Sequence, residues 1–370
     1  MMYLAWRNLV QTPVRLAAGV GGAALALLLI LSLDAVFAGV EQRITVYIDN
    51  SGADIFVAQE DVRNLHMASS SLRDGVKRKV AAVPGVEAVV PIDYLSNMIL
   101  VGENRELSYV IGIPENAAFG GPWNISAGKA RPAKREAIID RNVAEKAGVR
   151  IGDSVEIMGE DFKVAGLTEE TSSLVNSVSF ISTRDFEEIR GNYETFSFLL
   201  VKVLPGISPT QVTKRIQSEV REVTPQTRMD FAGQERRVVG DMSTDVVTIM
   251  NLVGFLIGLS VMALTTYTAT LARKSEYGVL KALGARNSQL YSLVLVQAVM
   301  GVALGLAGSL ILTLGLASMI PRLGLSMVMA IKGTSIFKVA GLSVLIAGIA
   351  AVMPIRQISG LDPAMVFRGR

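Results

Sequence analysis

Four long apolar segments, separated by polar sequence, dominate the pattern of this chain. They are residues 16–40, 246–272, 290–320 and 336–353. A helix needs about 20 apolar residues to cross the hydrocarbon core of a bilayer, so each segment predicts a transmembrane helix. The first segment is longer than the apolar core of a secretory signal peptide, about 7–15 residues, and we interpret it as a retained helix.

Basic residues beside the apolar segments indicate their orientation. Arg7 and Arg15 precede the first segment, and Arg273 and Lys274 follow the second. Lysine and arginine are enriched in the cytoplasmic loops of membrane proteins, so these positions predict the cytoplasmic side. The segments expected in the cytoplasm are therefore residues 1–15, 273–289 and 354–370, and those expected outside are residues 41–245 and 321–335.

The polar residues 41–245 carry the charges, prolines and turns of a water-soluble domain. Strand-like and helix-like patterns alternate in two places, which predicts two β-α-β units. The predicted elements are a strand at 53–58, a helix at 71–83 and a strand pair at 86–100, then a strand at 196–203, a helix at 208–223 and a strand at 227–231. Between them, residues 113–183 alternate as short strands with Gly-Asp turns and predict an inserted β-rich subdomain. Residues 233–245 lack proline, so we expect one helix to continue from the domain into the second apolar segment.

Composition and charge narrow the function classes. Half of the 370 residues are hydrophobic and 6% are aromatic, and the mean hydropathy is +0.42, which favours a membrane protein. The formal charge is only +3, and no basic stripe for phosphates is present, so nucleic-acid binding is not expected. Because the chain has no cysteine and one histidine, His66, we expect no catalytic residues, no bound cofactor and no metal site. The sequence also lacks a G-x-x-x-x-G-K-[ST] motif, so another chain would have to hydrolyse any ATP.

Asp34 is the acidic residue within the first apolar segment. At 1.5 Å per residue it lies about 27 Å along the helix from Leu16. An acid inside a membrane helix is a functional candidate. At this depth we favour the simpler interpretation that Asp34 marks the point where the helix enters water.

The loop after the second apolar segment carries the most specific pattern. It reads R-K-S-E-Y-G-V-L-K-A-L-G-A-R from Arg273 to Arg286. On charge alone it would be a loop that sets topology. However, its core E-Y-G-V-L-K-A-L-G-A and the glycines of the next segment, including Gly301 and Gly305, resemble the C-terminal half of the FtsX/MacB-like (type VII) ABC transporter permease family. The order of elements in residues 41–245 also resembles the MacB-like periplasmic core domain.

This resemblance implies a fold and a partner. The implied fold is an α-helical membrane protein with four transmembrane helices plus an α/β extracytoplasmic domain, in which split porter-like β-α-β units hold an inserted β-rich subdomain. In this family the loop is a coupling helix that docks on a separate ABC ATPase. That ATPase would bind ATP and Mg, so this chain is not expected to be an enzyme. The candidate ATPase-coupling residues are Arg273, Lys274, Glu276, Tyr277, Gly278, Lys281, Ala282 and Gly284.

Glycines within the apolar segments are candidates for close helix packing. The candidates for helix packing or a dimer seam are Gly19, Gly21, Gly22, Gly254, Gly258, Gly301 and Gly305. For Gly301 and Gly305 we expect packing within one chain. The family implies a homodimer whose seam lies on the first two apolar segments, so the glycines there could serve either the seam or packing within the chain.

The function that these observations favour is that of an ABC transporter permease subunit. It would export or extract a hydrophobic or amphipathic substrate, such as a lipid, lipoprotein, peptide or drug, by passing movement from the ATPase to the outer domain. This mode of efflux is mechanotransmission. We expect a multi-pass protein of the bacterial cytoplasmic (inner) membrane with both termini cytoplasmic, in contact with membrane lipid, and a periplasmic adaptor (membrane fusion) protein is a further candidate partner. The alternative is an FtsX-like signalling or regulatory membrane protein that activates an extracytoplasmic hydrolase or sensor without transport.

Overall fold

The structure is a computed structural model of the chain, and it describes residues 11, 13–66, 68–172, 176–320 and 328–360. The chain divides into two compact units. One is a helical unit that contains residues up to Gly39 and most residues from Ser243 onward. The other is an α/β domain, Val40–Met242.

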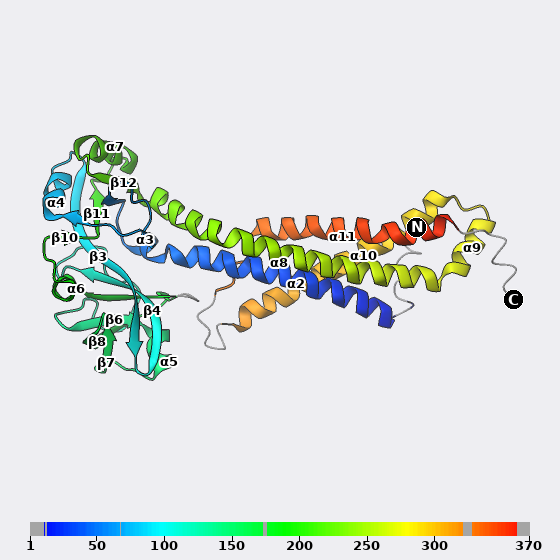
Figure 1. Cartoon of the computed structure of the whole chain (residues 1–370), viewed down its shortest axis with the longest axis horizontal. Coiled ribbons are helices and arrows are strands. Elements are labelled where there is room, and N and C mark those ends of the chain that lie inside the picture. Colours follow the sequence, from blue (N-terminus) through cyan, green and yellow to red (C-terminus); the bar gives the residue numbers. More distant parts are fainter. Residues whose placement is uncertain (1–10, 12, 67, 173–175, 321–327, 361–370) are drawn as a thin grey trace. The chain divides into compact units, whose positions relative to one another are not determined.

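Long helices make up the helical unit (Figure 1). The helices that contribute to it are α2 (Pro13–Ile44), α8 (Arg228–Ala272), α9 (Lys274–Ala282), α10 (Asn287–Met319) and α11 (Gly333–Ser359). Among the described residues, four stretches are long and apolar enough to cross a membrane: Leu16–Ile44, Thr244–Ala272, Asn287–Met319 and Gly333–Ser359. The four transmembrane helices expected from the sequence are therefore confirmed as elements of the fold.

The helix ends differ from the ends of the apolar segments. Helix α11 continues through Pro354 to Ser359, although the apolar segment ends at Met353. A proline removes one backbone hydrogen bond, but helices in membrane proteins tolerate it where neighbouring groups compensate. Hydropathy therefore located the helices but not their last turns.

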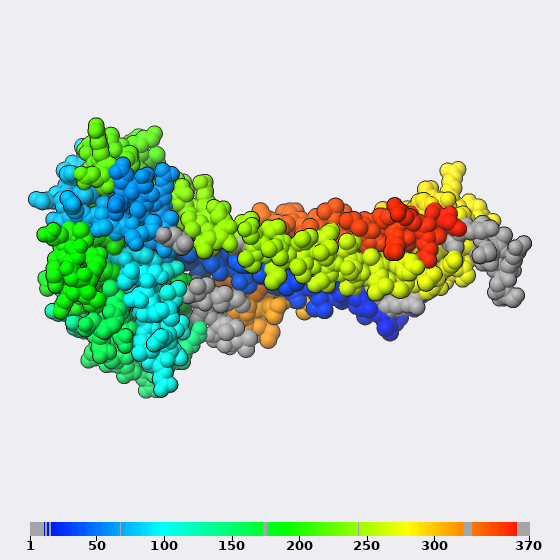
Figure 2. Space-filling view, viewed as in Figure 1, coloured from blue at the N-terminus to red at the C-terminus, as the bar shows by residue number. Residues whose placement is uncertain are grey.

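The helical unit buries a core and keeps an apolar exterior. Leu27, Met262 and Val294 are among the side chains in its buried cluster. Leu25 and Ile311 are exposed although they are large and apolar. Figure 2 shows the outer surfaces of α8, in yellow-green, and α11, in orange to red, beside each other in this unit. Apolar side chains on both the inside and the outside are expected of a helix bundle surrounded by lipid.

A ten-stranded sheet forms the frame of the α/β domain. Its strand order is β12-β1-β11-β3-β4-β9-β6-β8-β5, and β7 pairs with β3 and β8. The strands are β1 (Ile55–Gln59), β3 (Val86–Val101), β4 (Asn104–Ile113), β5 (Ile125–Gly128), β6 (Glu136–Asp140), β7 (Ser154–Ile157), β8 (Glu160–Thr168), β9 (Ser177–Ser182), β11 (Phe198–Val203) and β12 (Val223–Thr227), with a separate pair β2 (Leu72–Arg73) and β10 (Thr195–Phe196). The helices within the domain are α3 (Val46–Asn50), α4 (Asp74–Ala81), α5 (Arg141–Ala147), α6 (Thr183–Arg190) and α7 (Pro209–Glu219).

The two predicted β-α-β units are present as β1-α4-β3 and β11-α7-β12. The strand pair predicted at residues 86–100 is wrong, because this segment is the single strand β3. Their strands lie next to one another in the sheet, in the order β12-β1-β11-β3. Val76 and Val80 of α4 and Val212 and Ile216 of α7 join one buried cluster with these strands. The inserted part, from β4 to β9 with α5 and α6, has a cluster of its own that includes Phe162. The α/β domain with an inserted β-rich part is therefore confirmed.

The strand predicted at residues 227–231 is wrong beyond its first residue. Strand β12 ends at Thr227, and helix α8 starts at Arg228. The Thr227 hydroxyl donates to Asp230 Oδ2 at 2.6 Å and accepts from the Asp230 N–H at 3.2 Å. A side chain that accepts from the first turn stabilises the start of a helix, which explains the early helix.

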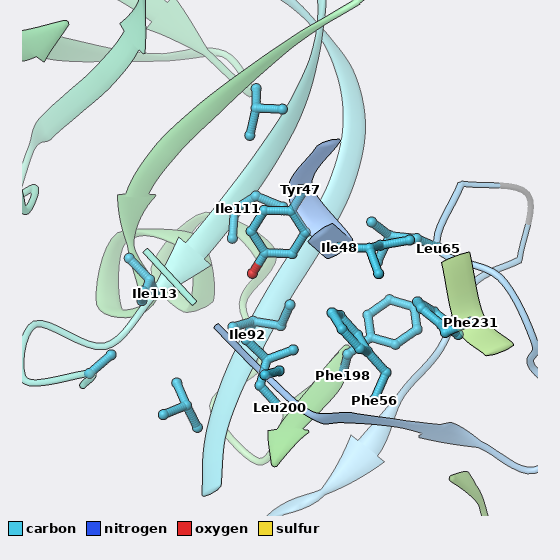
Figure 3. Packing of buried hydrophobic residues seen from close by; sticks show 14 of the residues in the cluster. Tyr47, Ile48, Phe56, Leu65, Ile92, Ile111, Ile113, Phe198, Leu200 and Phe231 are labelled. Carbon is cyan, nitrogen blue, oxygen red and sulfur yellow. The ribbon is translucent and has the colours of Figure 1, made fainter. Parts of the chain in front are cut away.

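The first turn of α8 is anchored in the core of the α/β domain (Figure 3). The Phe231 ring stacks on Phe56 of β1, with ring centroids 4.8 Å apart. It also meets Phe198 of β11 edge-on, with centroids 6.0 Å apart. From this anchor, α8 continues without a break to Ala272.

Candidate functional site

Helix α9 connects α8 to α10 and contains most of the predicted coupling residues. Arg273 lies in a turn outside the α-helical range of φ and ψ and separates α9 from α8. After Ala282 the chain turns at Gly284, where φ is +92°. This left-handed conformation favours glycine because a Cβ atom would be strained there. Helix α9 is therefore a short helix with a defined start and end.

One face of α9 packs against the helical unit. The Tyr277 side chain is only 3% exposed and belongs to the buried cluster of the unit, and Gly278 is also buried. Lys281 Nζ donates to the backbone carbonyl of Ser359 in α11 at 3.2 Å. Arg273 Nη2 donates to Gln11 Oε1 at 3.2 Å. These contacts hold α9 in place. Burial of the Tyr277 side chain also raises the pKa of its hydroxyl group.

The opposite face of α9 is an exposed stripe. We define this stripe as Glu276, Val279, Leu280 and Leu283, all of which are exposed. Their spacing of three, four and seven residues places them on one side of a helix. The Glu276 side chain is 62% exposed, and Leu283 is 80% exposed. An acid beside three apolar side chains offers both a polar contact and apolar area to a partner.

The structure divides the predicted coupling residues into two groups. Lys274, Glu276, Ala282 and Gly284 are exposed. Arg273 and Lys281 are partly buried, and Tyr277 and Gly278 are buried. The last four residues help to position α9, and of these only Tyr277 and Gly278 are buried. The assignment of all eight residues to ATPase coupling stays a prediction. Sequence reasoning missed Val279, Leu280 and Leu283, although their helical spacing with Glu276 was a usable signal.

The candidate glycines of α2 and α8 lie where the two helices touch. A Cβ atom on Gly19 would come within 2.6 Å of Thr265 Cγ2, and one on Gly254 within 2.7 Å of Ile30 Cγ1. A Cβ atom on Gly22 would overlap Val261 Cγ1. Close packing between α2 and α8 of one chain therefore occupies these three positions. Gly21 differs, because nothing lies within 4 Å of its Cβ position.

The remaining candidate glycines lie at contacts among α2, α8 and α10. A Cβ atom on Gly305 of α10 would lie 2.9 Å from Ala23 Cβ of α2. One on Gly301 would lie 3.3 Å from Met262 Cε of α8, and one on Gly258 would lie 3.2 Å from Ala26 Cβ. The contacts of Gly301 and Gly305 are with helices of the same chain, and their role in helix packing stays a prediction.

Three polar residues meet near one end of the helical unit. Asp34 of α2 pairs with Lys338 of α11, Oδ2 to Nζ 3.1 Å. Asn251 of α8 donates from Nδ2 to Asp34 Oδ1 at 3.4 Å. The Asp34 side chain is only 8% exposed, so its carboxylate is enclosed within the unit and not surrounded by solvent. These two contacts connect α2, α8 and α11. A residue that only marked the point where α2 enters water would need no such partners.

The described residues contain no group of three His, Cys, Asp or Glu side chains placed to hold a metal ion. Taken together, the described residues form four apolar helices, a short helix with an exposed stripe and an α/β domain, which define a multi-pass membrane protein.

Comparison with protein-family models identifies the family. The model of the MacB-like periplasmic core domain matches residues 19–219, which is more than half of the chain. The model of the FtsX-like permease C-terminal domain matches residues 248–363. The chain therefore belongs to the MacB/FtsX-like family and is an ABC transporter permease of this type.

Relatives cover the whole chain at low identity. An uncharacterized ABC transporter permease of Mycobacterium tuberculosis (strain H37Rv) is 21% identical over 371 residues, covering 100% of both chains. One of Methanocaldococcus jannaschii is 24% identical over 233 residues, covering 60% of this chain and 58% of the relative. The crystal structure of the periplasmic region of MacB from Actinobacillus actinomycetemcomitans aligns with 50% of this chain and 93% of its own length, at 12% identity and a TM-score of 0.40.

Proposed function

We propose that this chain is the permease subunit of an ABC transporter and that the exposed stripe of α9 docks on a separate ATPase subunit. The exposed stripe is the observation that carries the proposal. A large apolar side chain such as Leu283, 80% exposed at the end of a helix anchored by the buried Tyr277, is a typical contact for a protein partner. Family membership supports an ATPase as that partner.

The ATPase would bind ATP and Mg, and this chain would not hydrolyse ATP itself. The absence of a phosphate-binding loop from the sequence supports this division of labour. The membrane is the cytoplasmic membrane of a bacterium, with both termini and α9 on the cytoplasmic side and the α/β domain outside. Two basic residues at the start of α9, Arg273 and Lys274, support this orientation.

Movement would pass from α9 through α8 to the α/β domain, in the manner of mechanotransmission. Helix α8 suits this role because it is one uninterrupted helix, Arg228–Ala272, whose first turn is fixed in the core of the domain through Phe231. The working unit would be a homodimer with two ATPase subunits, and a periplasmic adaptor is a further proposed partner. The substrate would be hydrophobic or amphipathic.

The proposal predicts that Glu276→Lys, which reverses the charge of the exposed stripe, removes ATPase binding. This chain is co-expressed with each ABC ATPase of its host, and co-purification and vanadate-sensitive ATP hydrolysis are measured. One ATPase should bind the wild type, and the substitution should lower its recovery at least about tenfold, since a charge mismatch at an interface costs on the order of several kcal/mol. Glu103→Lys makes the same charge change at an exposed position of the α/β domain and should have no effect.

If no ATPase binds, or Glu276→Lys and Glu103→Lys behave alike, the docking assignment is wrong. If an ATPase binds and hydrolyses ATP but no lipid, peptide or drug is moved, the chain acts as the FtsX-like regulator described above.

A further inference from the structure

One edge of strand β3 has a gap in its pairing. This edge pairs with β11 up to Ile92 and with β7 at Leu100 and Val101. Between these two strands, residues 93–99 pair with β4 on the opposite edge, but with no strand on this edge among the described residues. A strand left open on one side presents backbone donors and acceptors to a further strand.

Local hydrogen bonds show which backbone groups face the gap. The Tyr94 N–H donates to the Ser197 hydroxyl at 3.0 Å, so Tyr94 directs its backbone groups away from β4. In an antiparallel pair, alternate residues direct both groups to the same side, and β3 pairs with β4 without a register shift. Ser96 and Met98 therefore face the gap too. The Met98 N–H is bonded to Asn97 Oδ1 at 2.7 Å, whereas the N–H and carbonyl of Ser96 have no partner among the described residues.

A cavity of about 520 Å³ lies beside this edge. Its walls include the consecutive residues Tyr94, Leu95 and Ser96. Neighbouring residues of a strand point to opposite faces, so a cavity lined by all three lies along the edge of β3 and not over one face. Met158, which follows β7, and Ser197, which precedes β11, also line it. The cavity therefore occupies the place of a missing strand between β7 and β11.

The sequence at the gap lacks the usual protection of a sheet edge. Natural sheets protect their edges with charges, prolines or very short strands. The two outer strands of this sheet follow that rule, since β12 contains Pro225 and β5 has four residues. Residues 95–99 read L-S-N-M-I, without a charge or a proline. Leu95 and Met98 are 39% and 50% exposed, so apolar side chains flank the open backbone.

The neighbouring strands limit the length of an occupant. Residues 95–99 span about 14 Å at about 3.4 Å per residue, which gives room for about four residues of a paired strand. A longer strand would collide with β7 at one end or with β11 at the other. A stable contact between folded proteins buries at least about 1,000 Å², so this short gap fits a free peptide better than a partner domain.

We propose that the gap in β3 binds a short extended peptide of about four residues as an additional strand. The N–H and carbonyl of Ser96 pair with the peptide backbone, and the peptide side chains lie in the cavity on either face. Because backbone pairing provides the binding, the extended conformation defines the ligand class. This binding does not depend on ATPase docking and can be measured without the ATPase.

Two uncharged peptides test the proposal, acetyl-Val-Thr-Val-Thr-amide and acetyl-Thr-Val-Thr-Val-amide. Their β-branched residues favour the extended form, and they place valine on opposite faces of a strand. The full chain is reconstituted in nanodiscs, and binding is measured by saturation-transfer difference NMR against empty nanodiscs. At least one peptide should bind the protein saturably.

N-methylation of the bound peptide distinguishes backbone pairing from other binding. Alternate N–H groups of a strand face its neighbour, so methylation of the second and of the third residue should have different effects. One methylated peptide should bind at least about tenfold more weakly, because it loses a hydrogen bond and cannot approach β3 closely. The other should bind within about threefold of the parent peptide.

Two variants locate the pairing at Ser96. Ser96→Pro removes the N–H that faces the gap but no hydrogen bond to β4, so it should weaken peptide binding about tenfold. Ser96→Ala is the matched control, because it keeps the backbone groups and should leave binding unchanged. The unfolding midpoint shows whether each variant folds, and the methylated peptides remain decisive if Ser96→Pro does not.

Three results would overturn the proposal. The first is that neither peptide binds beyond the empty nanodiscs. The second is that the two methylated peptides bind equally well or equally poorly. The third is that a folded Ser96→Pro variant binds the peptide as tightly as the wild type.

Discussion

Gly22→Leu is expected to disrupt the packing of α2 against α8, whereas Gly21→Leu, one residue away, is expected to leave it intact. At Gly22 even a Cβ atom would overlap Val261 Cγ1, but at Gly21 nothing lies within 4 Å. Overpacking a close contact costs about 1–3 kcal/mol, and helices in lipid have few other sources of attraction. Gly22→Leu should therefore lower the midpoint of thermal unfolding of the detergent-solubilised chain.

The same pair of substitutions also tests for a dimer seam. Suppose that α2 of a second copy packs against Gly21. Gly21→Leu should then leave the unfolding midpoint unchanged, but it should shift the chain from dimer to monomer in size-exclusion chromatography with light scattering. Equal unfolding midpoints for Gly21→Leu and Gly22→Leu would contradict the packing of α2 on α8 described here.

Lys338→Met is expected to destabilise the helical unit because it leaves Asp34 without its ion-pair partner. The Asp34 side chain is 8% exposed and its carboxylate lies 3.1 Å from Lys338 Nζ. An unpaired acid costs about 2.5–3.5 kcal/mol at the centre of a membrane helix on insertion scales. Asp34 lies near one end of the helical unit, so we expect a smaller cost here. The measurement is again the unfolding midpoint of the solubilised chain.

A second substitution distinguishes the lost ion pair from lost packing. Asp34→Asn added to Lys338→Met removes the unpaired charge while Asn251 can still donate to residue 34. The double variant should regain most of the lost stability, because removing both charges is often close to neutral. If the double variant is as unstable as Lys338→Met, the ion pair does not hold these helices together.

Hydrophobic pattern predicted the large elements of this fold and missed details that depend on local contacts. The four apolar segments became helices because bilayer-length apolar sequence has few other stable forms. The end of β12 depended on hydrogen bonds between Thr227 and Asp230, which period-two alternation does not reveal. The extension of α11 past Pro354 was missed because proline predicts a break in soluble helices.

The candidate sites show a similar limit. Sequence spacing located α9, but the burial of each side chain depended on which face of α9 the bundle covers. The sequence therefore did not show that Tyr277 is buried. His66 carried no sequence signal, because its partner Glu235 is 169 residues away along the chain. The environment of a single histidine is known only once the fold shows which side chain lies next to it.

The most direct test of the proposed ATPase docking is photocrosslinking in cells. A photoreactive amino acid is placed at Leu283 in the exposed stripe of α9 or at Phe337 in α11, which are 80% and 81% exposed. Because the two side chains are almost equally exposed, Phe337 serves as a control for nonspecific crosslinking. Docking through the exposed stripe predicts a crosslinked product with an ABC ATPase from Leu283 and none from Phe337. Absence of an ATPase product at Leu283, or the same product from both positions, would contradict it.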